Sequence, residues 1–157
     1  MLQDAIEEPN NVKKGKKFES FFENFMDQQQ SFVYVDRHCR SRVGEVDYFY
    51  RVELRDHPLW ERYPFLFIEC MNWKEPISSE KMDHFIRLVI PKQVLSCCGL
   101  YITTSSFSPE ALTTVRDAII NNEIMIILID KNDLFDLIDR GFKAFVQAKS
   151  EKILAEV

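Results

Sequence analysis

Two short apolar runs constrain the fold of this 157-residue chain more than any other feature. Residues 65–68 (Phe-Leu-Phe-Ile) and 124–129 (Ile-Met-Ile-Ile-Leu-Ile) contain no polar side chain. Such runs are typical of strands that are buried on both faces of a helix-covered sheet. We therefore expect an α/β protein, with residues 123–129 as a strand in the centre of its sheet.

The remaining segments predict a mixed sheet flanked by helices on both faces. Strands are expected at residues 31–35, 45–55, 65–70, 99–104 and 123–129. Helices are expected from the lysine-rich segment 13–17 to residues 28–30, after Ser78 or Ser79, after the Ser108 cap, and along Leu134–Phe145. The first three strands are adjacent, which suggests an antiparallel meander, whereas the later strand–helix–strand units require parallel pairing. Residues 1–12 are expected to be a flexible lead-in, and residues 13–157 a single domain.

Composition narrows the functional classes. The net charge of −5 argues against a surface coated in basic residues, although it allows a local basic groove or a carboxylate cluster neutralised by metal. The cysteines Cys39, Cys70, Cys97 and Cys98 show no C-x-x-C spacing, so we expect free thiols and no zinc site. We find neither a signal peptide nor an apolar run of about 20 residues, and expect a cytoplasmic protein without a membrane partner.

Acidic residues on neighbouring predicted strands are the candidates for chemistry. Asp47 lies in the second strand and Glu69 near the end of the third. Adjacent strands could bring both carboxylates to one ion, with the main-chain carbonyl of Cys70 as a further ligand. Oxygen ligands of this kind suit Mg²⁺ or Mn²⁺.

Each acid also has a purely structural interpretation. Glu69 could be a charge at the sheet edge or one partner of an ion pair. Glu19 and Glu23 lie four residues apart on a predicted helix flanked by lysines, a spacing that also fits a solvated helix face.

Several segments, in the right order, resemble the Mrr-like group of the PD-(D/E)xK nuclease superfamily. Residues 68–78 (Ile-Glu-Cys-Met-Asn-Trp-Lys-Glu-Pro-Ile-Ser) resemble its third motif, which usually reads Glu-Cys-Lys-x-(Trp/Tyr). Residues 15–19 resemble the opening helix, and Gly44-Glu-Val-Asp47 resembles the second-motif aspartate. Residues 99–111 and 127–134 resemble the later strand–turn–helix segments, so the likeness covers about residues 15–140.

The resemblance implies a restriction-endonuclease-like fold and cleavage of phosphodiester bonds in double-stranded DNA. It implies that Asp47 and Glu69 are ligands of Mg²⁺ or Mn²⁺, and that Glu19 assists through water or a second ion. It further implies defence against foreign or modified DNA. Because duplex cleavage requires two cuts, a homodimer is expected by analogy.

One position departs from the family pattern. The lysine expected two residues after Glu69 is Met71, whose thioether can neither activate water nor offset phosphate charge. The domain could be a DNA-binding relic, Lys74 or Lys81 could replace the lysine, or Met71 could be an engineered change. A catalytically inactive DNA-binding or assembly module is therefore the alternative function. For Lys74, a hydrated turn charge is the structural alternative.

Other polar residues are candidates for contacts to DNA phosphates. They are Arg37, Arg40, Arg42, Trp73, Thr104 and Ser105, with residues 13–17 as a second basic patch. Trp73 could equally be a packing residue, residues 103–106 an ordinary loop, and each basic patch a solvated cluster.

Overall fold

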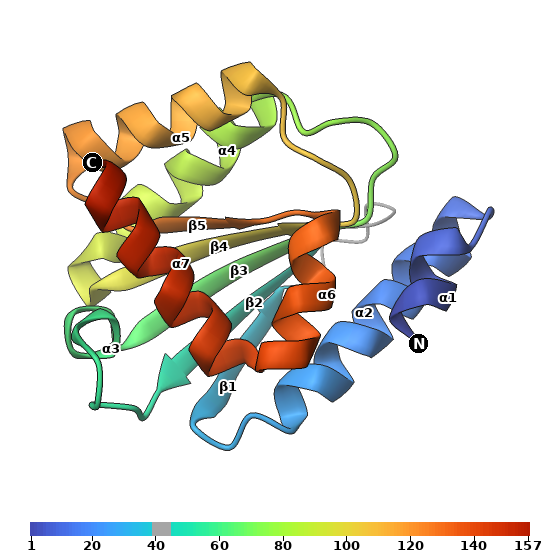
Figure 1. The fold of residues 1–157 in the computed structure, drawn as a ribbon, viewed down its shortest axis with the longest axis horizontal. Helices are drawn as coiled ribbons and strands as arrows, with labels where there is room; N and C mark the ends of the chain where they lie inside the picture. Colours follow the sequence, from blue (N-terminus) through green and yellow to red (C-terminus); the bar gives the residue numbers. More distant parts are fainter. Residues whose placement is uncertain (39–44) are drawn as a thin grey trace.

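The computed structural model describes the backbone of residues 1–38 and 45–157, and the side chains of these residues except 36–38 and 45–47. The elements in chain order are α1 (Leu2–Glu7), α2 (Asn11–Asp27), β1 (Phe32–His38), β2 (Glu45–Val52), α3 (Pro58–Arg62), β3 (Phe65–Met71), α4 (Ser79–Val89), the 3-10 helix η1 (Ile90–Leu95), β4 (Cys97–Thr103), α5 (Pro109–Asn122), β5 (Ile126–Ile129), α6 (Lys131–Arg140) and α7 (Phe142–Glu156). Figure 1 shows their arrangement around one sheet.

Within the described residues the sheet has five strands in the order β1-β2-β3-β4-β5. β2 pairs antiparallel with β1 and β3, whereas β4 pairs parallel with β3 and β5. The predicted meander followed by parallel strands is therefore confirmed. The position expected for residues 123–129 was wrong, because β5 is at the end of the strand order. An apolar sequence indicates that both faces of a strand are buried. Helices cover both faces of β5, although β4 is its one paired strand among the described residues.

Helices cover both faces of the sheet, as predicted (Figure 1). One core lies beneath α2, α6 and α7, and the other beneath α4 and α5. The predicted caps of α4 and α5 are confirmed, because the side chains of Ser78 and Ser108 accept backbone N–H groups in the first turn of each helix.

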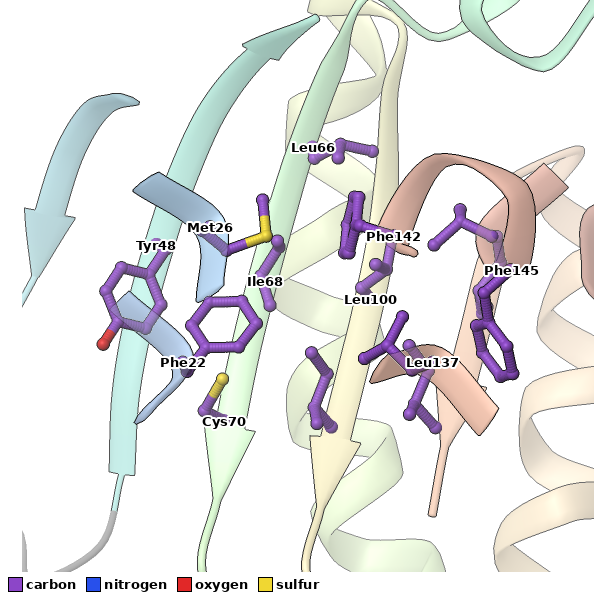
Figure 2. Packing of buried hydrophobic residues seen from close by; sticks show 14 of the residues in the cluster. Phe22, Met26, Tyr48, Leu66, Ile68, Cys70, Leu100, Leu137, Phe142 and Phe145 are labelled. Atoms are coloured by element: carbon purple, nitrogen blue, oxygen red, sulfur yellow. The ribbon is translucent and has the colours of Figure 1, made fainter. Parts of the chain in front are cut away.

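The phenylalanine stripe of α2 packs on the middle of the sheet. Phe22 is fully buried, and its ring centroid is 5.1 Å from that of Tyr48 on β2. Figure 2 shows Phe22 and Met26 over Ile68 and Cys70 of β3. Burying one such side chain contributes about 1.5–3 kcal/mol. This contact fixes α2 over β2 and β3, the strands that carry the predicted acids.

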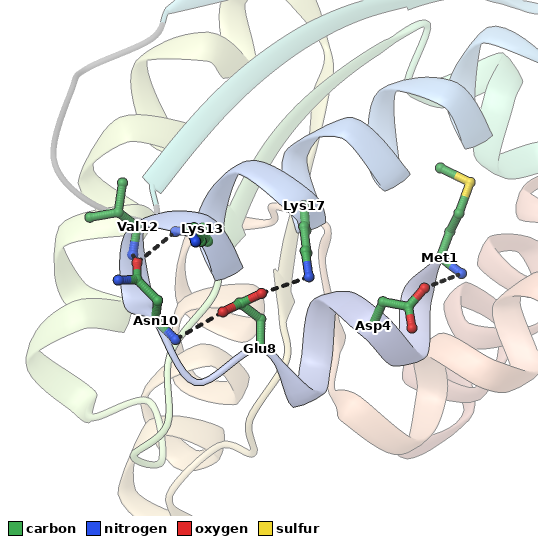
Figure 3. A network of polar contacts seen from close by, with 7 residues as sticks. All are labelled: Met1, Asp4, Glu8, Asn10, Val12, Lys13 and Lys17. Atoms are coloured by element: carbon green, nitrogen blue, oxygen red, sulfur yellow. Dashed lines mark hydrogen bonds and ion pairs between the residues drawn. The ribbon is translucent and has the colours of Figure 1, made fainter.

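The N-terminal residues differ from the expected lead-in, because residues 2–7 form α1 and bury Leu2, Ala5 and Ile6 against the core. The Asn10 side chain accepts the N–H groups of residues 12 and 13 and so caps α2. Glu8 pairs with Lys17 at 2.6 Å across the junction between the two helices (Figure 3). These contacts hold the first turn of α2 in place.

The single C-terminal helix expected along 134–145 is in fact two helices. Gly141 separates α6 from α7 with φ +83° and ψ 153°, a conformation that glycine adopts without a steric penalty. Asp130 and Asp133 form a capping box at the start of α6 where a turn was expected. In the described part of the chain, no helix has the length and apolar character to span a bilayer.

Candidate active site

Glu69 is a buried acid two residues before the end of β3, the middle strand of the sheet. It lies in β3 and is 5% exposed. Its neighbours Ile68 and Cys70 belong to the core under α2, so strand alternation places Glu69 on the opposite face, with Phe67 and Met71. A carboxylate in such surroundings is expensive unless charge or hydrogen bonds compensate it.

The register of β2 with β3 places the two predicted metal ligands opposite each other. Asp47 of β2 is the direct antiparallel partner of Glu69. Direct partners belong to the same face of a sheet, with Cβ atoms generally about 4.5–5.5 Å apart. The side chain of Asp47 is outside the described part of the structure. At the level of the backbone, the two positions are adjacent, as the sequence analysis expected.

Met71 shares the face of Glu69 and is 2% exposed. The hydroxyl of Tyr101 donates to its Sδ at 3.1 Å. Tyr101 is also the parallel-strand partner of Glu69. Sequence reasoning missed Tyr101, because only the register of β3 with β4 brings it to the acids.

Cys70, the source of the predicted carbonyl ligand, has its side chain in the core under α2. Glu19 lies on α2 and is half-buried. Glu23, one turn further, accepts a hydrogen bond from the Tyr48 hydroxyl at 3.1 Å. α2 covers one face of the sheet, whereas Glu69 belongs to the other face. The helix acids Glu19 and Glu23 therefore lie in a different layer from Glu69.

The loops that follow β3 and β4 are tied together by side chains. Thr104 is buried, and its hydroxyl donates to Asn72 Oδ1 at 2.6 Å. The Ser105 hydroxyl donates to the carbonyl of Lys74 at 3.1 Å. Both hydroxyls that were predicted to contact DNA therefore make bonds within the protein.

Trp73 and Lys81 lie beside each other at the same edge. Trp73 is 38% exposed, and the Lys81 ammonium is 4.5 Å from the centroid of its ring. This cation–π contact engages Lys81, one of the two candidates to replace the missing lysine. The other, Lys74, is exposed.

The arginine patch can be placed only in part. Arg37 pairs with Tyr48 in the register of β1 with β2, and its side chain is not described. Arg40 and Arg42 fall within residues 39–44, outside the described residues.

Lys14 is a buried cation that sequence reasoning treated only as part of a basic patch. It is 6% exposed, on the same stripe of α2 as Phe18 and Phe22. Burial lowers the pKa of Lys14, and the positive charges of Lys74 and Lys131 lower it further. Its spacing of four residues before Phe18 was the available signal.

Within the described side chains, no group of three or more His, Cys, Asp or Glu residues could hold a metal ion. Any metal site at this edge therefore depends on Asp47 beside Glu69, together with main-chain or solvent oxygen atoms.

The structure thus has a mixed sheet between helix layers, with acids at directly paired positions of two adjacent strands. The family comparison agrees, because the Mrr catalytic-domain family, described as a restriction endonuclease, matches residues 12–138. The chain therefore belongs to the Mrr restriction endonuclease family, and the predicted resemblance is confirmed.

Two solved structures resemble the chain. "Structure of EndoMS in apo form" shares 9% identity with a TM-score of 0.46, over 71% of this chain and 45% of that chain. "MspJI Restriction Endonuclease in Complex with 27-mer Oligonucleotide" shares 20% identity with a TM-score of 0.44, over 88% of this chain and 31% of that chain. The chain thus spans less than half the length of either protein. No curated protein gives a significant match.

Proposed function

We propose that this domain is a divalent-metal-dependent DNA endonuclease of the restriction type. Asp47 and Glu69 would bind Mg²⁺ or Mn²⁺, assisted by the main-chain carbonyl of Cys70. Its substrate would be double-stranded DNA, and two copies would act together to cut both strands. Membership of the restriction endonuclease family supports this activity.

The observation that carries the proposal is the direct pairing of Asp47 with Glu69. Two carboxylates at directly opposed positions repel each other, and a divalent cation between them removes that repulsion. The burial of Glu69 strengthens the argument, because a bound cation would compensate its desolvation.

The donor set fits such a cation. Two carboxylates and a carbonyl supply hard oxygen ligands, which Mg²⁺ and Mn²⁺ prefer, and water can complete the coordination. Bound there, the ion would activate a water molecule for attack and offset charge on the scissile phosphate.

Met71 supports a second candidate function, a DNA-binding module that no longer cleaves. Its enclosed thioether contacts Tyr101 where the family pattern has a lysine. A thioether cannot orient water or neutralise a phosphate. Activity of the native chain would therefore require a lysine from another part of the backbone, such as Lys74.

A plasmid cleavage assay separates the two functions. We would incubate supercoiled plasmid with the native protein and with Met71→Lys, each with Mg²⁺ or Mn²⁺. Cleavage by the native protein indicates a displaced lysine. Cleavage by Met71→Lys alone indicates an intact metal site in a silenced nuclease, because lysine can replace methionine with little change in shape.

Asp47→Ala is the matched control. It should abolish both cleavage and the metal-dependent rise in melting temperature. In the native protein, metal at 100-fold above its Kd should add about 2.7 kcal/mol to the free energy of unfolding. If neither protein cuts DNA and metal leaves the melting temperature unchanged, the proposed metal site is wrong.

A further inference from the structure

The backbone brings three lysines from distant parts of the chain to the carboxyl-terminal edge of the parallel strands. Lys14 is in the first turns of α2, Lys74 follows β3, and Lys131 begins α6 after β5. Ser105 connects two of them, because its carbonyl accepts the Lys131 N–H at 2.9 Å and its hydroxyl donates to the Lys74 carbonyl. The loops after three successive strands are therefore held side by side (Figure 1).

Lys14 completes this cluster from the helix layer. The capped start of α2 fixes its backbone (Figure 3). The positive charges of Lys74 and Lys131 both lower the pKa of Lys14, as expected for cations that lie near it. Among the described residues, no side chain forms a hydrogen bond or ion pair with any of the three ammonium groups. The buried ammonium group of Lys14 therefore has no anionic partner among the side chains that the structure describes.

A cavity of about 400 Å³ lies between the start of α2 and the loop after β3. Asn11, Asn72, Trp73, Lys74 and Glu75 line it. The side-chain oxygen of Asn72 accepts the Thr104 hydroxyl, whereas its Nδ2 is buried and has no acceptor. A buried donor without an acceptor is costly, and a bound anion would satisfy it.

We propose that Lys14, Lys74 and Lys131, with the amide of Asn72, form a phosphate-binding site that holds a phosphodiester of the DNA backbone. The ammonium groups offset its charge and the amide donates to an oxygen. Glu75 also lines the cavity, but it is exposed, so its carboxylate stays hydrated. The choice of DNA as the phosphate source rests on the proposed nuclease function.

The test measures binding of a short DNA duplex by fluorescence anisotropy in EDTA, where metal-dependent cleavage cannot occur. Each lysine that contacts a phosphate contributes about −1 to the slope of log K against log salt. Lys14→Met and Lys131→Met should each flatten this slope by about 1 and weaken binding by roughly 3–10-fold at 0.1 M salt. Lys152→Met, at an exposed lysine of α7 outside every proposed DNA-contacting patch, should bind like the native protein.

Lys74→Met controls for misfolding of the buried-lysine variant, because residue 74 is exposed and its substitution leaves both cores unchanged. It should weaken binding in the same way as Lys14→Met. If native protein binds DNA and all three variants match Lys152→Met, the lysine site is refuted while the nuclease proposal stands.

Inorganic phosphate distinguishes the source of the ligand. If DNA does not bind but phosphate raises the melting temperature of the native protein and not of Lys14→Met, the site takes free phosphate and the DNA nuclease proposal fails. If neither DNA nor phosphate binds, the lysine site itself is refuted.

Discussion

Replacing Lys14 with methionine should make the protein more stable. Methionine keeps the length and volume of the side chain and removes its positive charge. Lys14 is only 6% exposed, and the charges of Lys74 and Lys131 act on it as well. Relief of an unfavourable feature commonly adds about 0.5–2 kcal/mol. For a chain of this size, that corresponds to a rise in Tm of roughly 1–8 °C.

The gain should depend on pH, with a defined sign. The pKa of Lys14 is lowered in the folded state from its usual value of 10.5. Below the folded-state pKa, both states carry the charge and the full penalty of burying it applies. As pH rises from there to 10.5, the unfolded chain binds more protons than the folded chain, so the penalty disappears. The advantage of Lys14→Met should therefore shrink between pH 7 and pH 10.

Thermal melts in phosphate- and sulfate-free buffer would measure this effect, with Lys16→Met as the control. Anions must be absent because they would occupy the proposed site and stabilise the native protein. The reasoning is refuted if Lys14→Met melts below the native protein, if it behaves like Lys16→Met, or if its advantage is the same at pH 7 and pH 10. Greater stability together with weaker phosphate binding would indicate that Lys14 serves binding at the expense of stability.

Three further predictions concern backbone, packing and thiols. Gly141→Ala should destabilise the fold by about 1–3 kcal/mol in urea unfolding, although an added Cβ meets no atom within 4 Å, because φ is +83° there; an unchanged midpoint would contradict this. Gly99→Ala should cost about 1–3 kcal/mol for another reason, since its Cβ would lie 2.8 Å from Val89 Cγ2; Val89→Ala in the same chain should restore part of the loss. Burial raises the pKa of Cys97 to about 12 and that of Cys98 well above its usual value. At pH 8 both thiols should therefore react with a thiol reagent only after unfolding. Rapid labelling of the native protein would contradict this expectation.

Local patterns predicted most elements of the fold. Phe18 and Phe22 revealed α2 through their helical spacing, and Ser78 and Ser108 marked helix starts because a cap bonds backbone within its own first turn. The order of segments predicted the mixed sheet, because adjacent strands can form hairpins whereas strand–helix–strand units cannot. α1 was missed because its three buried apolar residues form too short a pattern, and their burial depends on packing against α2.

Tertiary structure decided where β5 lies in the sheet and which distant residues come together in one site. Residues 123–129 reveal burial of both faces, yet nothing in them specifies that β5 is last in the strand order. The sequence by itself identified Asp47 and Glu69 as candidates, through residue type and position on strands. Only the register makes them direct partners and places Tyr101 beside Glu69, and only helix packing buries Lys14. Hydrogen bonding between strands and helix docking both act between residues that are far apart in the chain.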